Sequence, residues 1–275
     1  MQVAIIGCGY VGKALAQHLR TKSDYVITAT TTTQERVAEL ETIAHRVAVL
    51  KGNDTQALTG VIQSQDAVIL SVGAANADVY EETYLGTAKA IAAVLPKFPT
   101  VKQLIYTGSY ALYGDRQGEW VDESTAIAPA NQNGEIIAQT ERVLLAMSNP
   151  ALKVCIFRLG GIYGPGRELI KIFGRSAGMT RPGTGKEFSN WIHLEDIVGA
   201  LTFALENPLQ GIYNLVNSNP LPRGELIDRI LEHHGLSKIT WDASVKSTLP
   251  YNARVSNQKI QAAGYKFIHP KIAQY

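Results

Sequence analysis

The ten residues VAIIGCGYVG at positions 3–12 decide the fold of this chain. The first four are apolar and typical of a buried strand, and residues 11–19 then repeat apolar side chains at helical spacing. Between them lies the pattern GxGxxG: Gly7 permits a tight turn, Gly9 lets the backbone approach a pyrophosphate, and Gly12 lets helix and strand pack closely. The helix N-terminus also favours phosphate through its free N–H groups. The stretch therefore predicts a dinucleotide-binding loop, with a glycine-rich turn that binds no ligand as the alternative.

Strands and helices alternate over the first 158 residues. Apolar runs predict strands at 3–6, 25–29, 46–50, 67–72, 103–107 and 154–158. Helical spacing predicts helices at 11–19, 34–40, 84–95 and 134–147. This alternation is typical of a parallel sheet covered by helices on both faces. We therefore predict an α/β fold, a doubly wound parallel Rossmann sheet.

The pattern changes after Arg158, where glycine and proline become dense. Loops of this kind commonly carry binding surface. Helices are predicted again at 195–205 and 224–234, and one more strand at 211–216. We predict that residues 1–158 and 189–217 form an NAD(P)-binding Rossmann domain. Residues 159–188 and 218–275 are predicted to form a small, interleaved C-terminal lobe that binds substrate.

The composition is that of an ordinary soluble globular protein, with 45% hydrophobic and 18% charged residues. A net charge of +2 gives no electrostatic reason to expect nucleic acid or a membrane surface as partner, and no apolar run approaches the length of a membrane span. Nothing in the first residues resembles a signal peptide. Cys8 and Cys155, the two cysteines, are too few for a four-cysteine zinc site or a disulfide framework, and His233 and His234 point in different directions on one helix. We therefore expect no metal site and a reducing, cytoplasmic location.

The stretch after the second predicted strand bears on the choice of dinucleotide. NAD-selective domains often carry Asp or Glu there to bind the ribose hydroxyls. Residues 28–36 instead read TATTTTQER, with no carboxylate at the strand tip. Hydroxyls at Thr30 and Thr31 and the cation of Arg36 suit a 2′-phosphate, which favours NADP and leaves NAD as the alternative. The competing interpretation of Arg36 is a solvated helix residue.

Four further segments extend the pattern toward a known family: YTGSYALYG at 106–114, RLGGIYGPG at 158–166, WIHLEDI at 191–197 and GIYNL at 211–215. In order and spacing the chain resembles the extended short-chain dehydrogenases/reductases, which are nucleotide-sugar epimerases and dehydratases. The resemblance implies that Ser109 is the family's catalytic Ser/Thr. It implies a cofactor site formed by Gly7, Cys8, Gly9, Tyr10, Val11, Gly12, Thr30, Thr31, Arg36, Asn53, Asp54, Ser71, Val72, Gly73, Thr107, Arg158, Leu159, Gly160 and Gly161. It implies a substrate site formed by Tyr110, Tyr113, Tyr163, Arg167, Arg181 and His193.

The chain departs from this family at its acid/base pair, Tyr-x-x-x-Lys. In the family the tyrosine exchanges the proton, and the lysine lowers the tyrosine's pKa and holds the nicotinamide ribose. Alignment on Gly134 and Glu141 places Asn133 at the tyrosine position and Ile137 at the lysine position. No tyrosine of the chain has a lysine four residues later. The sequence therefore predicts an atypical member whose usual redox chemistry is lost.

Two functions follow from these observations. The first is an atypical reductase, epimerase or dehydratase for a nucleotide sugar or similar small molecule. For it, Glu135 is a candidate replacement acid/base, with a solvated first-turn residue as the alternative, and the basic residues of 167–186 suit a substrate phosphate or a solvated surface. The second is a non-catalytic, dinucleotide-binding sensor or scaffold. The resemblance also implies a homodimer formed through the helix that contains Asn133.

Overall fold

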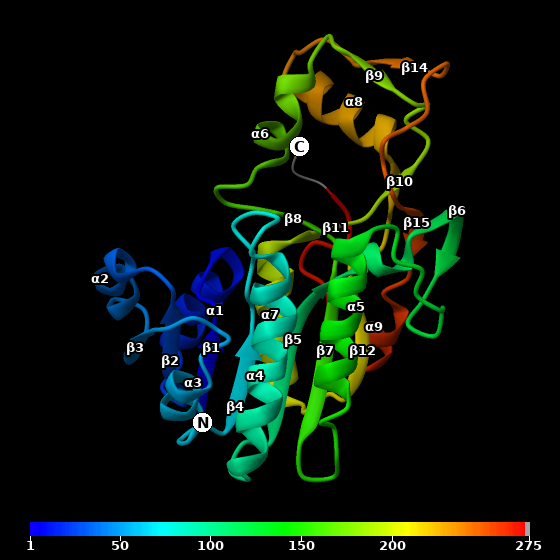
Figure 1. Ribbon diagram of the computed structural model, residues 1–275. Helices are drawn as coiled ribbons and strands as arrows, with labels where there is room; N and C mark the ends of the chain where they lie inside the picture. The colour runs from blue at the N-terminus through cyan, green and yellow to red at the C-terminus, as the bar shows by residue number, and fades with distance from the viewer. Residues whose placement is uncertain (273–275) are drawn as a thin grey trace. The chain divides into compact units, whose positions relative to one another are not determined.

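The computed structural model describes residues 1–272, and its ribbon is shown in Figure 1. The chain divides into two compact units. The first comprises residues 1–108, 132–157 and 198–213, and the second comprises residues 109–131, 158–197 and 214–275. Segments 109–131, 189–197 and 214–217 thus cluster with the second unit, although the sequence-based division assigns them to the sheet domain. The functional division into nucleotide-binding and substrate-binding parts stays a prediction.

A seven-stranded sheet with the order β12-β7-β5-β4-β1-β2-β3 organises the first unit. The pairs β1–β2, β1–β4, β2–β3 and β4–β5 are parallel. The order reverses between β1 and β4, the place where doubly wound folds bind nucleotides at the carboxyl ends of the strands. The strands are β1 (Gln2–Ile6), β2 (Val26–Thr31), β3 (Arg46–Val49), β4 (Ala67–Leu70), β5 (Gln103–Ser109), β7 (Lys153–Leu159) and β12 (Gly211–Leu215).

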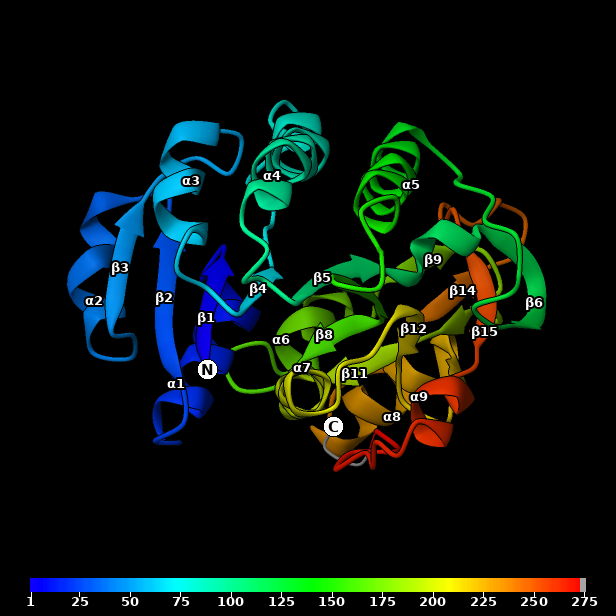
Figure 2. The same cartoon turned by 90° about the horizontal axis from the view of Figure 1, so that it is seen from below.

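Helices cover both faces of this sheet, as Figure 2 shows: α3, α4 and α5 lie on one face and α1 and α7 on the other. Leu58, Ile91 and Leu144 from the first group are fully buried in one core cluster with Val68 and Leu104 of the strands. The bounds are α1 (Tyr10–Arg20), η1 (Gln34–Arg36), α2 (Val37–Glu41), α3 (Thr55–Ile62), η2 (Glu82–Gly86), α4 (Thr87–Val94), η3 (Leu95–Lys97), α5 (Gln132–Leu145) and α7 (Leu194–Glu206).

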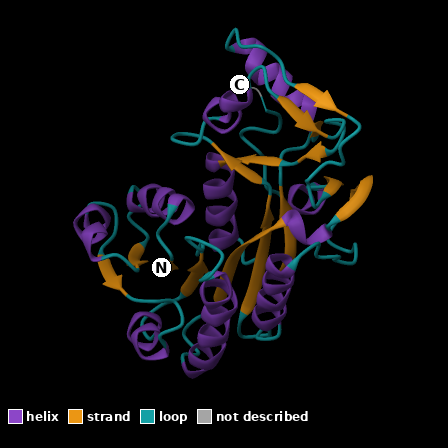
Figure 3. Cartoon of the chain, turned by 45° about the horizontal axis from the view of Figure 1, so that its top comes forward, coloured by secondary structure: helices purple, strands orange, loops and turns teal. Residues whose placement is uncertain are grey.

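The second unit is built from short helices and two-stranded pairs, seen as small orange arrows in Figure 3. β6–β15, β8–β11 and β9–β14 are parallel pairs, and β10–β13 is antiparallel. Leu226, Ile230 and Leu231 of one helix pack with Leu169 and Phe173 of another in its core. The bounds are η4 (Tyr110–Tyr113), β6 (Asp115–Val121), β8 (Gly161–Tyr163), α6 (Leu169–Phe173), η5 (Gly174–Ser176), β9 (Thr180–Pro182), β10 (Phe188–Ser189), β11 (Trp191–His193), β13 (Leu221–Pro222), α8 (Arg223–His233), β14 (Thr240–Asp242), β15 (Asn252–Val255) and α9 (Gln258–Ala262).

The predicted doubly wound α/β fold is confirmed, and each predicted strand is present with ends shifted by a few residues. The sequence analysis missed α3, which Asp54 caps by accepting a hydrogen bond from the N–H of Ala57 at 3.0 Å. It also missed the short pairs of the second unit, whose strands are too brief to show periodicity. Within residues 1–272 no helix has the length and apolarity needed to cross a bilayer.

Candidate functional site

The glycine loop joins β1 to α1 and is shaped by close backbone contacts. Gly7 has a φ of +93°, and a Cβ there would meet the carbonyl oxygen of Ser71 at 2.7 Å. A Cβ on Gly12 would meet the carbonyl oxygen of Gly7 at 2.4 Å. Both glycines are therefore required by the fold itself, because the loop lies against the end of β4 and against its own helix.

Gly9 differs, because a Cβ added there has no protein atom within 4 Å. Its φ of −75° is not left-handed, although its ψ of −146° lies outside the regular helical and extended regions. The packing of the folded chain thus does not require glycine at position 9, whereas close approach of a pyrophosphate would. Helix α1, which begins at the next residue, has no side-chain cap and no acidic residue in its first turn. These features suit an anion at the helix N-terminus.

Of the two threonines assigned to the cofactor site, Thr30 supports the glycine loop and Thr31 supports the end of its own strand. Thr30 and Thr31 are buried, and the Thr30 hydroxyl accepts a hydrogen bond from the N–H of Gly7 at 2.9 Å. The Thr31 hydroxyl accepts one from the N–H of Thr33 at 3.2 Å. Thr32 and Thr33 are the exposed hydroxyl residues at this strand end. The pattern predicted hydroxyls at this place, but it could not separate the supporting threonines from the exposed ones.

Arg36 lies beside the loop, and its charge acts on the thiol of Cys8. Its Nε donates to Glu39 at 3.3 Å, and Glu39 also pairs with Lys13 of α1. Arg36 is thus held at the loop by an ion-pair network, although its side chain is one third exposed. Burial raises the pKa of Cys8 to about 12, against smaller opposing effects of a Thr30 backbone hydrogen bond and of Arg36. Cys8 is therefore a protonated, buried packing residue at neutral pH.

The other expected cofactor residues of this unit lie at the carboxyl ends of neighbouring strands. Ser71 follows β4, and its hydroxyl lies 3.3 Å from that of Thr107 on β5. Gly73, two residues beyond Ser71, has no atom near an added Cβ. Asn53 donates to Glu82 at 3.0 Å, and Asp54 caps α3, so both have structural partners already. The structure brings Gly7 and Ser71 together, while Val72, the residue between Ser71 and Gly73, is half-buried against the core.

Helix α5 carries Asn133 and Ile137, the two residues that the sequence analysis aligns with the family's acid/base pair. Asn133 is exposed in its first turn, and Ile137, one turn later, is buried with 4% of its surface exposed. Neither side chain can exchange a proton near neutral pH. Farther along, the buried Glu141 lies near the fully buried Tyr106, whose pKa is raised well above its usual value by burial and then by the charge of Glu141.

Ser109 and Arg158 belong to the second unit. The Ser109 hydroxyl accepts a hydrogen bond from the N–H of Ala111 at 3.2 Å and so caps η4. Arg158 is 3% exposed, and its guanidinium lies 4.9 Å from the ring centre of Tyr113. The Tyr113 hydroxyl in turn donates to Asn214 at 2.8 Å. Burial raises the pKa of Tyr113, so its phenol keeps its proton and is a poor acid.

The other two tyrosines expected at the substrate site are also core residues. Tyr110 is 9% exposed with its ring against Tyr251, and burial raises its pKa. Tyr163 is 3% exposed and packs on Trp191 and His193. A substrate role for Tyr110, Tyr113 and Tyr163 stays a prediction, and for Tyr110 and Tyr113 the raised pKa disfavours loss of the phenol proton.

The turn between β7 and β8 is shaped by the strand beside it. A Cβ on Gly160 would meet the carbonyl oxygen of Asn190 at 2.9 Å, and a Cβ on Gly161 would meet the Trp191 ring at 2.9 Å. Leu159 is buried just before them. The glycines of this segment therefore have a packing cause, and their contact with the cofactor stays a prediction.

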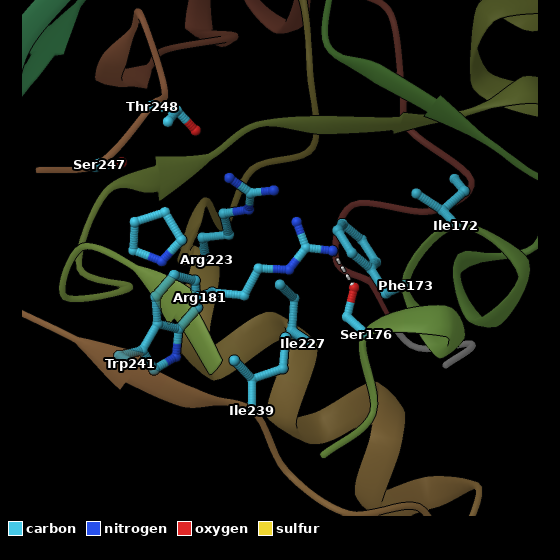
Figure 4. Close-up of a pocket in the computed structure, with 11 residues that line it drawn as sticks. Ile172, Phe173, Ser176, Arg181, Arg223, Ile227, Ile239, Trp241, Ser247 and Thr248 are labelled. Carbon is cyan, nitrogen blue, oxygen red and sulfur yellow. Dashed lines mark hydrogen bonds between the residues drawn. The ribbon is translucent and has the colours of Figure 1, made fainter. Parts of the chain in front are cut away.

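A cavity of about 210 Å³ lies within the second unit (Figure 4). The side chains of Arg181 and Arg223 lie next to each other in it. The Arg181 guanidinium donates to the Ser176 hydroxyl at 2.6 Å, while its buried Nε has no partner among residues 1–272. Burial and then the charge of Arg181 lower the pKa of Arg223, and Glu187 only partly opposes this. The remaining lining comprises Ile172, Phe173, Pro182, Ile227, Ile239, Trp241, Ser247 and Thr248.

The cavity shows what sequence analysis missed. Arg181 was predicted as a substrate residue, whereas Arg223 was not, because it begins α8 forty-two positions later with only Pro222 to mark a helix start. Arg167, also predicted, is exposed and lies in a small turn whose backbone pairs with Gly164. His193, at the end of β11, is buried and is not one of the residues that line this cavity. Burial and then the charge of His269 lower the pKa of His193.

The fold agrees with comparisons to known proteins. A model of the NAD-dependent epimerase/dehydratase family matches residues 3–216. The chain belongs to this family. Protein YeeZ of Escherichia coli K12 is 32% identical over 222 residues, which are 78% of this chain and 77% of YeeZ.

Two solved structures share the fold of this family member. Human epimerase family protein SDR39U1, solved with NADPH, has a TM-score of 0.75 at 19% sequence identity. The match covers 98% of this chain and 96% of the human chain. UDP-glucuronic acid 4-epimerase of Bacillus cereus, solved with UDP-glucuronic acid and NAD, has a TM-score of 0.76 at 17% sequence identity. The match covers 95% of this chain and 92% of the epimerase chain.

Proposed function

We propose that the protein binds a nicotinamide dinucleotide at the glycine loop and prefers NADP(H) to NAD(H). The observation that carries this is Gly9, the one loop glycine that the protein's own packing does not require, at an uncapped helix N-terminus. Gly7, Ser71 and Thr107 would line the same strand ends. The bound nicotinamide would supply hydride donation and acceptance.

The preference for NADP(H) rests on the end of β2. No carboxylate stands there to bind a ribose 2′-hydroxyl, and Arg36 is held beside the loop by Glu39. A guanidinium and the exposed hydroxyls of Thr32 and Thr33 are suited to a 2′-phosphate. Human SDR39U1, which shares the fold, was solved with NADPH, and this supports NADP(H) as the preferred dinucleotide.

The substrate we propose is a small molecule that carries phosphate, of the nucleotide-sugar class. Arg181 and Arg223 hold two cations close together at a partly apolar cavity, an arrangement that an anion would stabilise. About 210 Å³ is less than a typical pocket for a whole ligand of drug size. The cavity would therefore take the phosphate-bearing part, with Trp241 as an apolar wall.

The chemistry we propose is atypical. In this family member Asn133 and Ile137 occupy the positions of the usual proton donor and of its supporting lysine. Ser109 can position a substrate by hydrogen bonding but has no neighbouring base in sequence to make it a nucleophile. Glu135, exposed in the first turn of α5, is the remaining candidate acid/base.

A non-catalytic, dinucleotide-binding sensor or scaffold is the second candidate. The burial of Ile137 favours it, because the place where the lysine would reach the ribose is filled by a packed apolar side chain. A panel of nucleotide sugars assayed with NADP and NAD separates the two candidates: turnover that Glu135→Gln abolishes supports the enzyme, and binding of cofactor without turnover supports the sensor.

Binding of UDP, the phosphate-bearing part of such a substrate, tests the arginine cavity. We expect Arg181→Met and Arg223→Met each to weaken UDP binding by about 10-fold or more, since each removes charged hydrogen bonds to phosphate. Titration calorimetry at fixed ionic strength measures this. Arg175→Met, which removes an exposed cation one residue from Ser176, is the matched control and should bind like wild type. Equal affinity in all four proteins would place the phosphate elsewhere.

A further inference from the structure

Two histidines and a glutamate meet within the second unit and outside the arginine cavity, one histidine lying 74 residues along the chain from the glutamate. They are His193 at the end of β11, Glu195 in the first turn of α7, and His269. One ligand atom from each lies within 4.8 Å of the other two. His269 Nε2 lies 2.6 Å from Glu195 Oε2, and His193 Nδ1 lies 3.7 Å from the same oxygen.

We propose that His193, Glu195 and His269 bind a divalent metal ion of the zinc type. Zinc held by nitrogen and oxygen ligands at about 2.0–2.1 Å in tetrahedral geometry keeps its ligand atoms about 3.3 Å apart. The two separations, 2.6 and 3.7 Å, lie on either side of that value, so side-chain rotations would complete the geometry when an ion binds. Two imidazoles and one carboxylate are also a ligand set that zinc uses in proteins.

The chemistry of His193 supports this assignment. The backbone N–H of Glu195 approaches Nδ1 of His193 at 3.3 Å, so the lone pair of Nδ1 faces the side of Glu195 and the proton of the neutral ring lies on Nε2. The ring is 4% exposed and lies between Tyr163, whose ring is edge-on to it at a centroid distance of 5.0 Å, and His269, whose ring is tilted to it at 3.8 Å. A metal ion would bind that lone pair at the cost of one long hydrogen bond.

A second carboxylate fixes the position of His269. Asp196 is fully buried and accepts hydrogen bonds from the N–H groups of Ile268 at 2.6 Å and of His269 at 2.9 Å. It also accepts one from the Tyr265 hydroxyl at 3.2 Å. The segment is therefore held against the start of α7 before any ion binds. Glu195 is more than half exposed, which leaves a path for the ion and room for water as a fourth ligand.

Metal titration of the untagged, chelator-treated protein tests this site. We expect one equivalent of Zn²⁺ per chain by calorimetry, and one equivalent of Co²⁺ with the visible absorption of a low-symmetry site that Zn²⁺ displaces. Mg²⁺ should neither bind nor compete, because nitrogen ligands favour the later transition metals. Glu195→Gln and His269→Gln should each lower the Zn²⁺ affinity by at least about 10-fold, the loss that even outer-shell changes cause.

His233→Gln is the matched control, since it removes a helix α8 histidine that lies outside the cluster. It should leave affinity and stoichiometry unchanged. Glu195→Gln is an exposed change that keeps the backbone contacts, so it tests the site even if His269→Gln folds poorly. The proposal is overturned if wild type binds no Zn²⁺, if Glu195→Gln binds it as wild type does, or if His233→Gln loses it. Each of these would leave Glu195 and His269 as a pair of neighbouring side chains without a metal ion.

Discussion

Gly9→Asp is expected to abolish dinucleotide binding while leaving the fold intact. A Cβ at position 9 meets no protein atom within 4 Å, so the apo protein has room for the new side chain. Its carboxylate would stand where we place a pyrophosphate, and repulsion adds to the loss of close approach. At a ligand concentration ~100 times Kd, wild type should gain about 2.7 kcal/mol of stability from NADPH, and the variant should gain none.

Thermal melts with and without NADPH measure this difference. Gly60→Asp is the matched control. A Cβ added to Gly60 on α3 also has no atom within 4 Å, but this residue lies outside the glycine loop. It should melt near wild type and keep the NADPH shift. An undiminished shift in Gly9→Asp would mean that the dinucleotide binds away from the loop.

Asp196→Ala is expected to destabilise the second unit by at least about 3 kcal/mol. The carboxylate is fully buried, and its removal leaves the N–H groups of Ile268 and His269 without their acceptor, while the Tyr265 hydroxyl keeps the backbone carbonyl oxygen of residue 196 at 2.9 Å. Hydrogen bonds to a charged group contribute about 1.5–3 kcal/mol each. Urea unfolding gives the loss directly.

Glu232→Ala serves as the control for this change. Its carboxylate pairs with Lys238 at 3.5 Å, and both side chains are more than half exposed. Such surface pairs contribute at most about 1 kcal/mol, so the midpoint should move little. If Asp196→Ala unfolded at the same urea concentration as Glu232→Ala, the anchoring role of Asp196 would be refuted.

The glycine loop was predictable because its causes are local. Gly7, Gly9 and Gly12 follow a strand and open a helix within ten residues, and a short pattern records all of that. The sequence could not say that only Gly9 lacks an internal packing reason, since that depends on Ser71, which β4 brings to the loop. Similarly, TATTTT predicted hydroxyls near the loop, but only the structure shows that residues 28–31 are buried and that Thr32 and Thr33 are exposed.

The second unit was less predictable because its sites join distant residues. Arg181 and Arg223 meet in a cavity, and His193 meets His269, through short strand pairs that leave no periodicity in the sequence. The expectation of no metal site considered His233 and His234, whereas the cluster we propose forms across the fold. The homodimer and the cytoplasmic location stay predictions.

Titration of the untagged wild-type protein with NADPH and, separately, with NADH tests the central claim most directly. The account predicts one dinucleotide site per chain, with NADPH bound at least about 10-fold more tightly because Arg36 pairs with the 2′-phosphate. Arg36→Ala should remove that preference and leave NADH binding unchanged. Absence of binding by both dinucleotides would contradict the proposed function, and tighter binding of NADH would contradict the role given to Arg36.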